Sequence, residues 1–323
     1  MTDAWVITDG AAGNQRQALA LAQALGVRAR TLTLAPRPPW SWLAPRLTLG
    51  GRLAWPAATR VALAPPWPAL AIGCGRDAAL ATRLLRHLSD GSCRSVQILD
   101  PRAPARHWDL LIAPRHDDLV GTNVLHPLGS LHPVDAAWLA AARDGFAEFA
   151  ALPRPRLAVL LGGPRRGITL DAAWTGALIA SLRARRARDG GSVLLCASRR
   201  TPPALVASVG DALAGVPGVR WRGAQDGPNP YPGLLAWADR VIVSPDSVNM
   251  LSEAAATGVP VHTLVLAPLP RRLARFHAAL RAGGWLADLD ADSAPPSQPL
   301  RETAAIAAEV AHRFGLSLPH GGS

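Results

Sequence analysis

The sequence predicts an α/β protein of two domains, each built on a parallel sheet. Short apolar, β-branched segments alternate with longer amphipathic ones, which is typical of parallel strands joined by helices. The chain has 323 residues, enough for two domains of ordinary size. A proline-flanked segment at 153–155 separates two similar series. We therefore predict an N-terminal domain over 1–152, a C-terminal domain over 153–300, and a C-terminal helix and tail over 301–323.

The N-terminal series begins with a strand at residues 5–8, which a polar turn joins to a helix ending near Leu25. Within that helix Ala18, Leu21 and Ala22 recur with Leu25 at the spacing of one helical face. The patterns that follow predict strands at 28–34, 70–74, 96–100 and 110–113, and helices at 75–88 and 135–150.

Residues 36–68 differ in character from the rest of this half. Prolines are frequent, and the segment contains Trp40, Trp42, Trp55, Trp67, Arg37, Arg46, Arg52 and Arg60. Tryptophan and arginine beside apolar residues suit a membrane interface. The alternative is a loop-rich segment packed over the sheet, with one short helix near 42–53.

The C-terminal series has the same alternation of strands and helices. We expect strands at 157–161, 193–197, 219–222, 241–244 and 261–266, and helices at 171–188, from 202 onward, at 234–238, 247–257, 271–282 and 302–314. The unit 241–261 would complete the sheet.

The unit 241–261 is also the segment that most favours a ligand site. Asp246 or Ser247 can cap the helix after the strand, and the free N–H groups of a helix N-terminus suit a phosphate. Glu253 lies about one and a half turns into that helix, close enough to meet another part of the same ligand. The alternative is a buried strand–helix–strand unit with an ordinary surface glutamate.

Three loops of the C-terminal half follow predicted strands and should meet at one edge of the sheet. Their candidate ligand-binding residues are Gly162, Gly163 and Arg165; Ser198, Arg199 and Arg200; and Ser244, Asp246 and Ser247. Backbone N–H groups, hydroxyls and guanidiniums together suit a diphosphate. The lysine motif of ATP-binding phosphate loops is missing, which disfavours an ATPase.

The N-terminal half offers further polar candidates after its strands. Gly10 and Gly13 precede and begin a helix, but they do not form the dinucleotide fingerprint, and a tight turn or a cleft-lining loop explains them equally well. His116 and Asp117 follow another strand, where a hydrogen-bonded loop competes with a catalytic base. Their spacing fits no metal-ligand pattern.

Composition favours an anionic partner. The formal charge is +11, and every basic residue other than histidine is arginine, which binds phosphate bidentately. The scattered Cys74, Cys93 and Cys196 indicate neither a zinc site nor a disulfide framework, which fits a reducing cytosol. The first residues lack the features of a signal peptide, and no apolar run is long enough to span a membrane. We expect a cytoplasmic protein and no nucleic-acid partner.

Residues 252–260, Ser-Glu-Ala-Ala-Ala-Thr-Gly-Val-Pro, resemble the donor-site helix of GT-B glycosyltransferases. In the N-acetylglucosaminyltransferase that completes the lipid-linked peptidoglycan precursor, a similar glutamate binds the nucleotide ribose, so the resemblance implies this role for Glu253. Gly162 and Gly163 are similar to that enzyme's glycine loop after the first strand of its C-terminal domain.

A second resemblance covers nearly the whole chain. Its segments are 8–15 with Asn14, 73–76, 116–117, 121–124, 162–164, 198–201, 229–231 with Asn229 and Tyr231, and 246–250 with Asn249. They are similar to the elongated-mitochondria fission family of plants, which has many bacterial members. The family name describes a plant phenotype and gives no reaction. The resemblance implies a GT-B-like fold, with two Rossmann-like domains and a central cleft.

These features favour a GT-B-type glycosyltransferase that uses a nucleotide-sugar donor and a lipid-linked or cell-envelope acceptor. An inverting transfer needs a base, for which Asp9 and Asp117 are the first candidates and His116 the next. GT-B enzymes often need no metal, so the resemblance implies none, and no cofactor is expected. The protein would lie in the cytoplasm or on the inner face of the membrane, at its anionic surface. The alternatives are a non-catalytic scaffold with the same fold and an enzyme similar to UDP-N-acetylglucosamine 2-epimerase.

Overall fold

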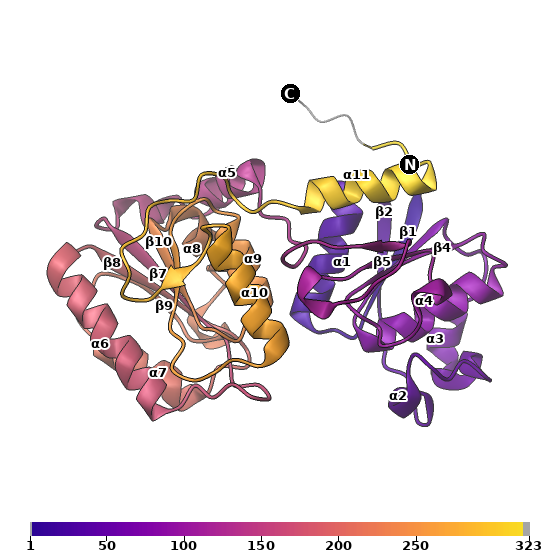
Figure 1. Ribbon diagram of the computed structural model, residues 1–323, viewed down its shortest axis with the longest axis horizontal. Helices are drawn as coiled ribbons and strands as arrows, with labels where there is room; N and C mark the ends of the chain where they lie inside the picture. The colour runs from indigo at the N-terminus through magenta and orange to yellow at the C-terminus, as the bar shows by residue number, and fades with distance from the viewer. Residues whose placement is uncertain (1, 319–323) are drawn as a thin grey trace. The chain divides into compact units, whose positions relative to one another are not determined.

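The computed structural model describes residues 2–318, which form two compact units (Figure 1). Unit 1 contains the residues up to Pro133 together with the segment that starts at Glu302, and unit 2 is Val134–Arg301. Each unit has one six-stranded sheet, and every strand pair is parallel. The predicted α/β class with two parallel sheets is confirmed.

The sheet of unit 1 has the strand order β2-β1-β3-β4-β5-β6. Its strands are β1 (Asp3–Thr8), β2 (Arg28–Thr33), β3 (Leu70–Cys74), β4 (Arg94–Ile98), β5 (Leu110–Ile112) and β6 (Val124–Leu125). Its helices are α1 (Ala12–Ala24), α2 (Trp40–Leu43), α3 (Ala57–Ala62), α4 (Arg76–Leu88) and α11 (Thr303–Phe314). The sequence did not predict β6, because two residues are too few to show an alternating pattern.

The alternation of side chains along β1 divides the core of unit 1 into two layers. Val6 packs in a cluster with residues of α1 and α11, whereas Trp5 and Ile7 pack in a cluster with residues of α4. Both faces of the sheet are therefore covered, as is usual for parallel sheets.

Residues 36–68 pack over the α4 side of this sheet, and they also expose apolar side chains. Ala54 and Trp55 are buried in the core cluster that contains α4, whereas Trp42 is 71% exposed and Leu49 is 84% exposed. The single short helix expected near 42–53 is wrong. The segment instead forms α2, a 3-10 turn at Gly51–Ala54, and α3, because its prolines interrupt longer helices.

The sheet of unit 2 has the strand order β12-β11-β10-β7-β8-β9. Its strands are β7 (Arg156–Leu161), β8 (Ser192–Ala197), β9 (Gly218–Trp221), β10 (Arg240–Val243), β11 (Val261–Thr263) and β12 (Ala287–Asp288). Its helices are α5 (Ala136–Gly145), α6 (Ala172–Asp189), α7 (Pro203–Ala212), α8 (Tyr231–Trp237), α9 (Val248–Ala255) and α10 (Arg271–Ala282). The expectation that β11 completes the sheet is wrong, since β12 pairs with its outer edge.

The division between the units differs from the predicted boundary after residue 152. α5 belongs to unit 2, where the Arg143 guanidinium donates to the Ala236 carbonyl at 2.9 Å. The predicted helix 135–150 also ends early, and a 3-10 turn at Ala147–Ala151 follows Phe146. The Phe146 ring packs on Gly233, where an added Cβ would lie 2.5 Å from the ring.

The C-terminal helix α11 is part of unit 1, although it follows unit 2 in the chain (Figure 1). The Glu302 carboxylate accepts the Leu128 N–H at 2.9 Å and the Gly129 N–H at 3.1 Å. The Thr303 hydroxyl donates to the His132 carbonyl at 2.8 Å. These bonds attach the start of α11 to the last loop of unit 1. Of the predicted tail, residues 319–323 lie outside the described residues.

Candidate functional site

Three loops of unit 2 meet at the carboxyl edge of its sheet. Because β10, β7 and β8 are adjacent and parallel, the residues that follow these strands lie side by side. These loops carry the sequence-predicted residues Gly162, Gly163 and Arg165; Ser198, Arg199 and Arg200; and Ser244, Asp246 and Ser247. The structure therefore brings together residues from three separate parts of the chain.

The buried carboxylate of Asp246 joins the three loops. Its Oδ2 accepts the Gly163 N–H at 3.1 Å and the Arg200 guanidinium at 2.9 Å. Its Oδ1 accepts the Ser244 hydroxyl at 2.7 Å, and Ser244 Oγ accepts the Gly162 N–H at 2.7 Å. A carboxylate with 0% exposure is stable only when donors surround it, and here they come from every loop. Its structural role is to hold the loops together.

The two glycines after β7 are explained by this close packing. A Cβ at Gly162 would lie 2.3 Å from Asp246 Oδ1, and one at Gly163 would lie 2.2 Å from the Arg200 carbonyl oxygen. No side chain fits at such distances, so the loops approach one another only because both residues are glycine. The packing of the loops alone accounts for the Gly-Gly pair.

Thr201 is a residue of this edge that the sequence analysis did not select. Its hydroxyl oxygen lies 2.8 Å from the Leu161 carbonyl oxygen and accepts the Ser198 N–H at 2.8 Å. It thereby fixes the loop after β8 to the end of β7. The signal that could have identified it is a serine followed three residues later by a threonine, a pattern that forms local side-chain turns.

Glu253 is buried inside unit 2, with 3% of its surface exposed. Its Oε2 accepts the hydroxyl of Tyr231, the first residue of α8, at 2.5 Å. The Tyr231 N–H in turn bonds to Asn229 Oδ1 at 3.0 Å. The alternative that Glu253 is an ordinary surface residue is wrong, because its helix packs this turn inside the unit. Sequence-predicted Asn229, Tyr231 and Glu253 thus form one connected group.

The N-terminus of α9 is capped by Ser247, whose hydroxyl accepts the Met250 N–H at 3.3 Å. Ser247 is therefore the cap, and Asp246 has the loop-joining role instead. Asn249 is half-buried in the first turn.

His277 of α10, which the sequence analysis missed, donates from Nε2 to the Pro245 carbonyl at 3.0 Å. Burial lowers the pKa of His277 to about 4, so the ring is neutral at pH 7.

Exposed guanidiniums surround this edge of the sheet. Arg165 donates to the Asp246 carbonyl at 3.1 Å, and the Arg200 side chain is 52% exposed while it bonds the Asp246 carboxylate. Arg166 and Arg199 are exposed and have no hydrogen bond or ion pair within residues 2–318. The edge is therefore positively charged, and two of its guanidiniums are available to an anion.

In unit 1, Asp9 and Asn14 form a turn after β1. The exposed Asp9 carboxylate accepts the Ala11 N–H at 2.9 Å and the Asn14 amide at 3.0 Å. Gly10 has a φ of +83° within this turn, and Gly13 lies in the first turn of α1. Of the interpretations left open for the two glycines, the structure contains the tight turn.

The other base candidates, His116 and Asp117, lie in a 3-10 turn (Arg115–Asp117) after β5. The Asp117 N–H bonds to the Pro114 carbonyl at 2.9 Å. Two strands separate β5 from β1, so this turn and Asp9 lie at the same edge but about 14 Å apart, three strand spacings. One substrate atom cannot meet both. Within the described residues, no three His, Cys, Asp or Glu side chains are arranged to hold a metal ion.

Comparison with protein families gives a match over most of the chain. The family model described as "Mitochondrial fission ELM1" matches residues 12–314. The chain is 32% identical over 272 residues to the mitochondrial fission protein ELM1 of Arabidopsis thaliana. This match covers 75% of the chain and 63% of the plant protein, so the chain spans less than two thirds of the length of that relative.

Solved structures with a similar fold are distant in sequence. A putative UDP-N-acetylglucosamine 2-epimerase from Listeria monocytogenes is 14% identical with a TM-score of 0.54, and the match covers 98% of each chain. Arabidopsis thaliana UGT89C1, complexed with UDP, is 14% identical with a TM-score of 0.50, covering 99% of this chain and 96% of that one. Both are GT-B fold proteins, so the fold is GT-B-like.

No helix within residues 2–318 is long and apolar enough to cross a membrane.

Proposed function

The chain belongs to the mitochondrial fission ELM1 family, and from this family and its GT-B-like fold we propose a glycosyltransferase that uses a nucleotide-sugar donor. Unit 2 would bind the nucleoside diphosphate where its three loops meet. The observation that carries the proposal is the pair of exposed guanidiniums, Arg166 and Arg199, that lack partners within residues 2–318 at this edge. A neighbour of similar fold was solved with UDP bound, which supports a ligand of this class.

The chemistry of the loops fits a diphosphate next to a ribose. Arginine side chains pair with phosphate oxygens by charge-assisted hydrogen bonds. Asp246 would place these loops without itself facing the anion, because its carboxylate is buried and neutralised by its own donors. Glu253 and Tyr231 would form the floor of the ribose site, where their oxygens would accept hydrogen bonds from ribose hydroxyls, since the single Tyr231 O–H is already donated to Glu253.

Unit 1 would supply the acceptor side and the base. Asp9 is the first candidate base because it is exposed at the end of β1, and Asp117 and His116 are the others. We further propose a lipid-linked or cell-envelope acceptor and a position at the anionic inner surface of the cytoplasmic membrane. The exposed Trp42 and Leu49 support this part of the proposal.

A second candidate is a non-catalytic binding protein that retains the fold. It is favoured by the internal bonds of Asp246 and Glu253, because both carboxylates already have partners inside unit 2. Such a protein would bind a nucleotide or a protein partner without turning over a sugar donor.

Thermal shift and calorimetric titration with UDP-, GDP-, ADP-, CDP- and TDP-linked compounds test donor binding. A ligand at 100 times its Kd should stabilise the protein by about 2.7 kcal/mol. Arg199→Gln should weaken the best ligand by about 10- to 150-fold, the value of a hydrogen bond to a charged group. Arg183→Gln, on the exposed surface of α6, is the matched control and should leave affinity unchanged.

The outcomes separate the candidate functions. If no compound changes the melting temperature at millimolar concentration, donor binding is rejected. Release of the nucleoside diphosphate with transfer or hydrolysis of the sugar supports the transferase, and binding without turnover supports the non-catalytic protein. An epimerised donor formed without acceptor would identify an epimerase instead.

A further inference from the structure

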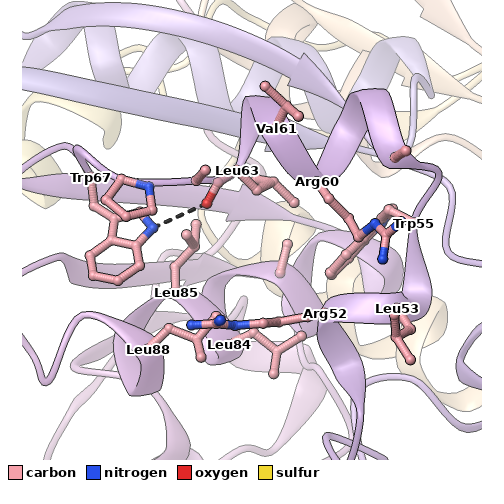
Figure 2. A pocket seen from close by; sticks show the side chains of 14 residues that line it. Arg52, Leu53, Trp55, Arg60, Val61, Leu63, Trp67, Leu84, Leu85 and Leu88 are labelled. Carbon is pink, nitrogen blue, oxygen red and sulfur yellow. Dashed lines mark hydrogen bonds between the residues drawn. The ribbon is translucent and has the colours of Figure 1, made fainter.

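An apolar pocket lies entirely within unit 1, between residues 52–67 and helix α4 (Figure 2). Leu84, Leu85 and Leu88 of α4 line one side, and Leu63 and Trp67 line another. Its volume is about 600 Å³, which is within the range of small-molecule sites. The pocket is therefore large enough for a ligand, and its walls are suited to a hydrocarbon.

The charged residues that line this pocket are both arginines. The side chains of Arg52 and Arg60 are exposed, and neither guanidinium has a hydrogen bond or an ion pair within residues 2–318. The sequence between residues 10 and 76 contains no aspartate or glutamate, so no carboxylate of this segment can neutralise them. An apolar pocket with two available guanidiniums is complementary to a ligand that carries both a hydrocarbon chain and an anion.

Trp55 adds a buried aromatic wall to the pocket. Its side chain lines the pocket with 3% exposure, and its indole N–H has no acceptor within the described residues. The other indole of the pocket, Trp67, donates to the Leu63 carbonyl at 3.1 Å, as the dashed line in Figure 2 shows. The Trp55 N–H itself is closed off from solvent, so the Trp55 ring serves as an apolar wall and not as a donor to a ligand.

We propose that this pocket binds one hydrocarbon chain of a phosphorylated lipid. The hydrocarbon chain would lie against the leucines of α4 and the ring of Trp55, and the phosphate would pair with Arg52 and Arg60. Leu53 and Val61, which line the pocket yet are 56% and 76% exposed, would lie beside the head group at the lipid surface. Binding requires no nucleotide, so this inference can hold or fail independently of the donor site in unit 2.

The test measures binding of dodecyl phosphate by calorimetric titration below its critical micelle concentration, on the full chain without nucleotide. Dodecyl maltoside, which has the chain without the charge, and inorganic phosphate, which has the charge without the chain, should each bind at least about tenfold more weakly. Two variants test the site of the hydrocarbon chain. Ala57→Trp fills the pocket from an exposed position and should weaken the binding of dodecyl phosphate at least about tenfold. Ala58→Trp is the matched control, exposed on the same helix but outside the pocket.

Two further variants examine the charge. Arg52→Gln with Arg60→Gln should weaken dodecyl phosphate at least about tenfold and leave dodecyl maltoside within about twofold. Arg37→Gln with Arg106→Gln removes the same charge from exposed positions outside the pocket and should change neither. The proposal is overturned if Ala57→Trp binds dodecyl phosphate as tightly as the unaltered protein. It is also overturned if both arginine pairs weaken binding equally, or if inorganic phosphate binds as tightly as dodecyl phosphate.

Discussion

Replacing Asp246 with alanine should destabilise unit 2 by about 4 kcal/mol. The substitution leaves the buried Gly163 N–H and the Ser244 hydroxyl without their acceptor. Each buried, unsatisfied donor costs about 1–3 kcal/mol, so the two together cost about 2–6 kcal/mol. The Arg200 side chain is 52% exposed and can return to water, so its lost ion pair adds less than about 1 kcal/mol.

Asp246→Asn separates the hydrogen bonds from the volume of the side chain. The amide oxygen can still accept from Gly163 and Arg200, and the amide nitrogen can donate to Ser244 Oγ. We therefore expect a smaller cost, about 1–2 kcal/mol, from weaker bonds to a neutral acceptor. Asp292→Ala is the control in the same unit, because its carboxylate is 83% exposed and lies 3.8 Å from Arg188. It should change stability by less than about 0.5 kcal/mol.

The measurement is hydrogen exchange in β7, β8 and β10, combined with urea unfolding of the whole chain. Exchange is needed because two units can unfold separately, so a single transition does not report on unit 2 alone. The role given to Asp246 is refuted if alanine costs no more than the Asp292 control. If Asp246→Asn destabilises unit 2 as much as Asp246→Ala does, the side chain stabilises the unit for a reason other than the hydrogen bonds that it accepts.

Three more perturbations have defined outcomes. Tyr231→Phe removes the hydroxyl that Glu253 accepts and should cost about 1–3 kcal/mol in urea unfolding; unchanged stability would contradict the buried bond. Because the pKa of His277 is lowered to about 4 in the folded state, its contribution to stability is complete above about pH 6.5 and is lost as pH falls toward 4. The loss should reach roughly 3 kcal/mol and be missing in His277→Gln, as urea unfolding between pH 4.5 and 7 will show. Gly75→Ala should lower the melting temperature, because φ there is +91° and a Cβ would lie 2.5 Å from a side-chain nitrogen; Gly145→Ala, with nothing within 4 Å, should not.

Local patterns in the sequence predicted the elements that position the candidate site. Helix α10 was expected at 271–282 and lies at Arg271–Ala282, because its boundaries are marked by a proline before it and glycines after it. The strands before the three loops were also expected, and parallel strands necessarily present their carboxyl ends at one edge. The pattern was less informative for short edge strands such as β6 and β12, whose two residues each depend on pairing with a neighbour.

The sequence signals used here act between near neighbours: the alternation of apolar and polar residues, the turn residues and the helix caps. They were enough to predict the α/β class and the two parallel sheets. The meeting of the three loops then followed, because parallel strands end at one edge of a sheet. Only the tertiary structure decided that Asp246 is buried and that Glu253 is bonded to Tyr231, because burial and partners come from segments far apart in the chain. For the same reason, the position of α5 in unit 2, the return of α11 to unit 1 and the apolar pocket against α4 depend on long-range packing. No local sequence window contains those contacts.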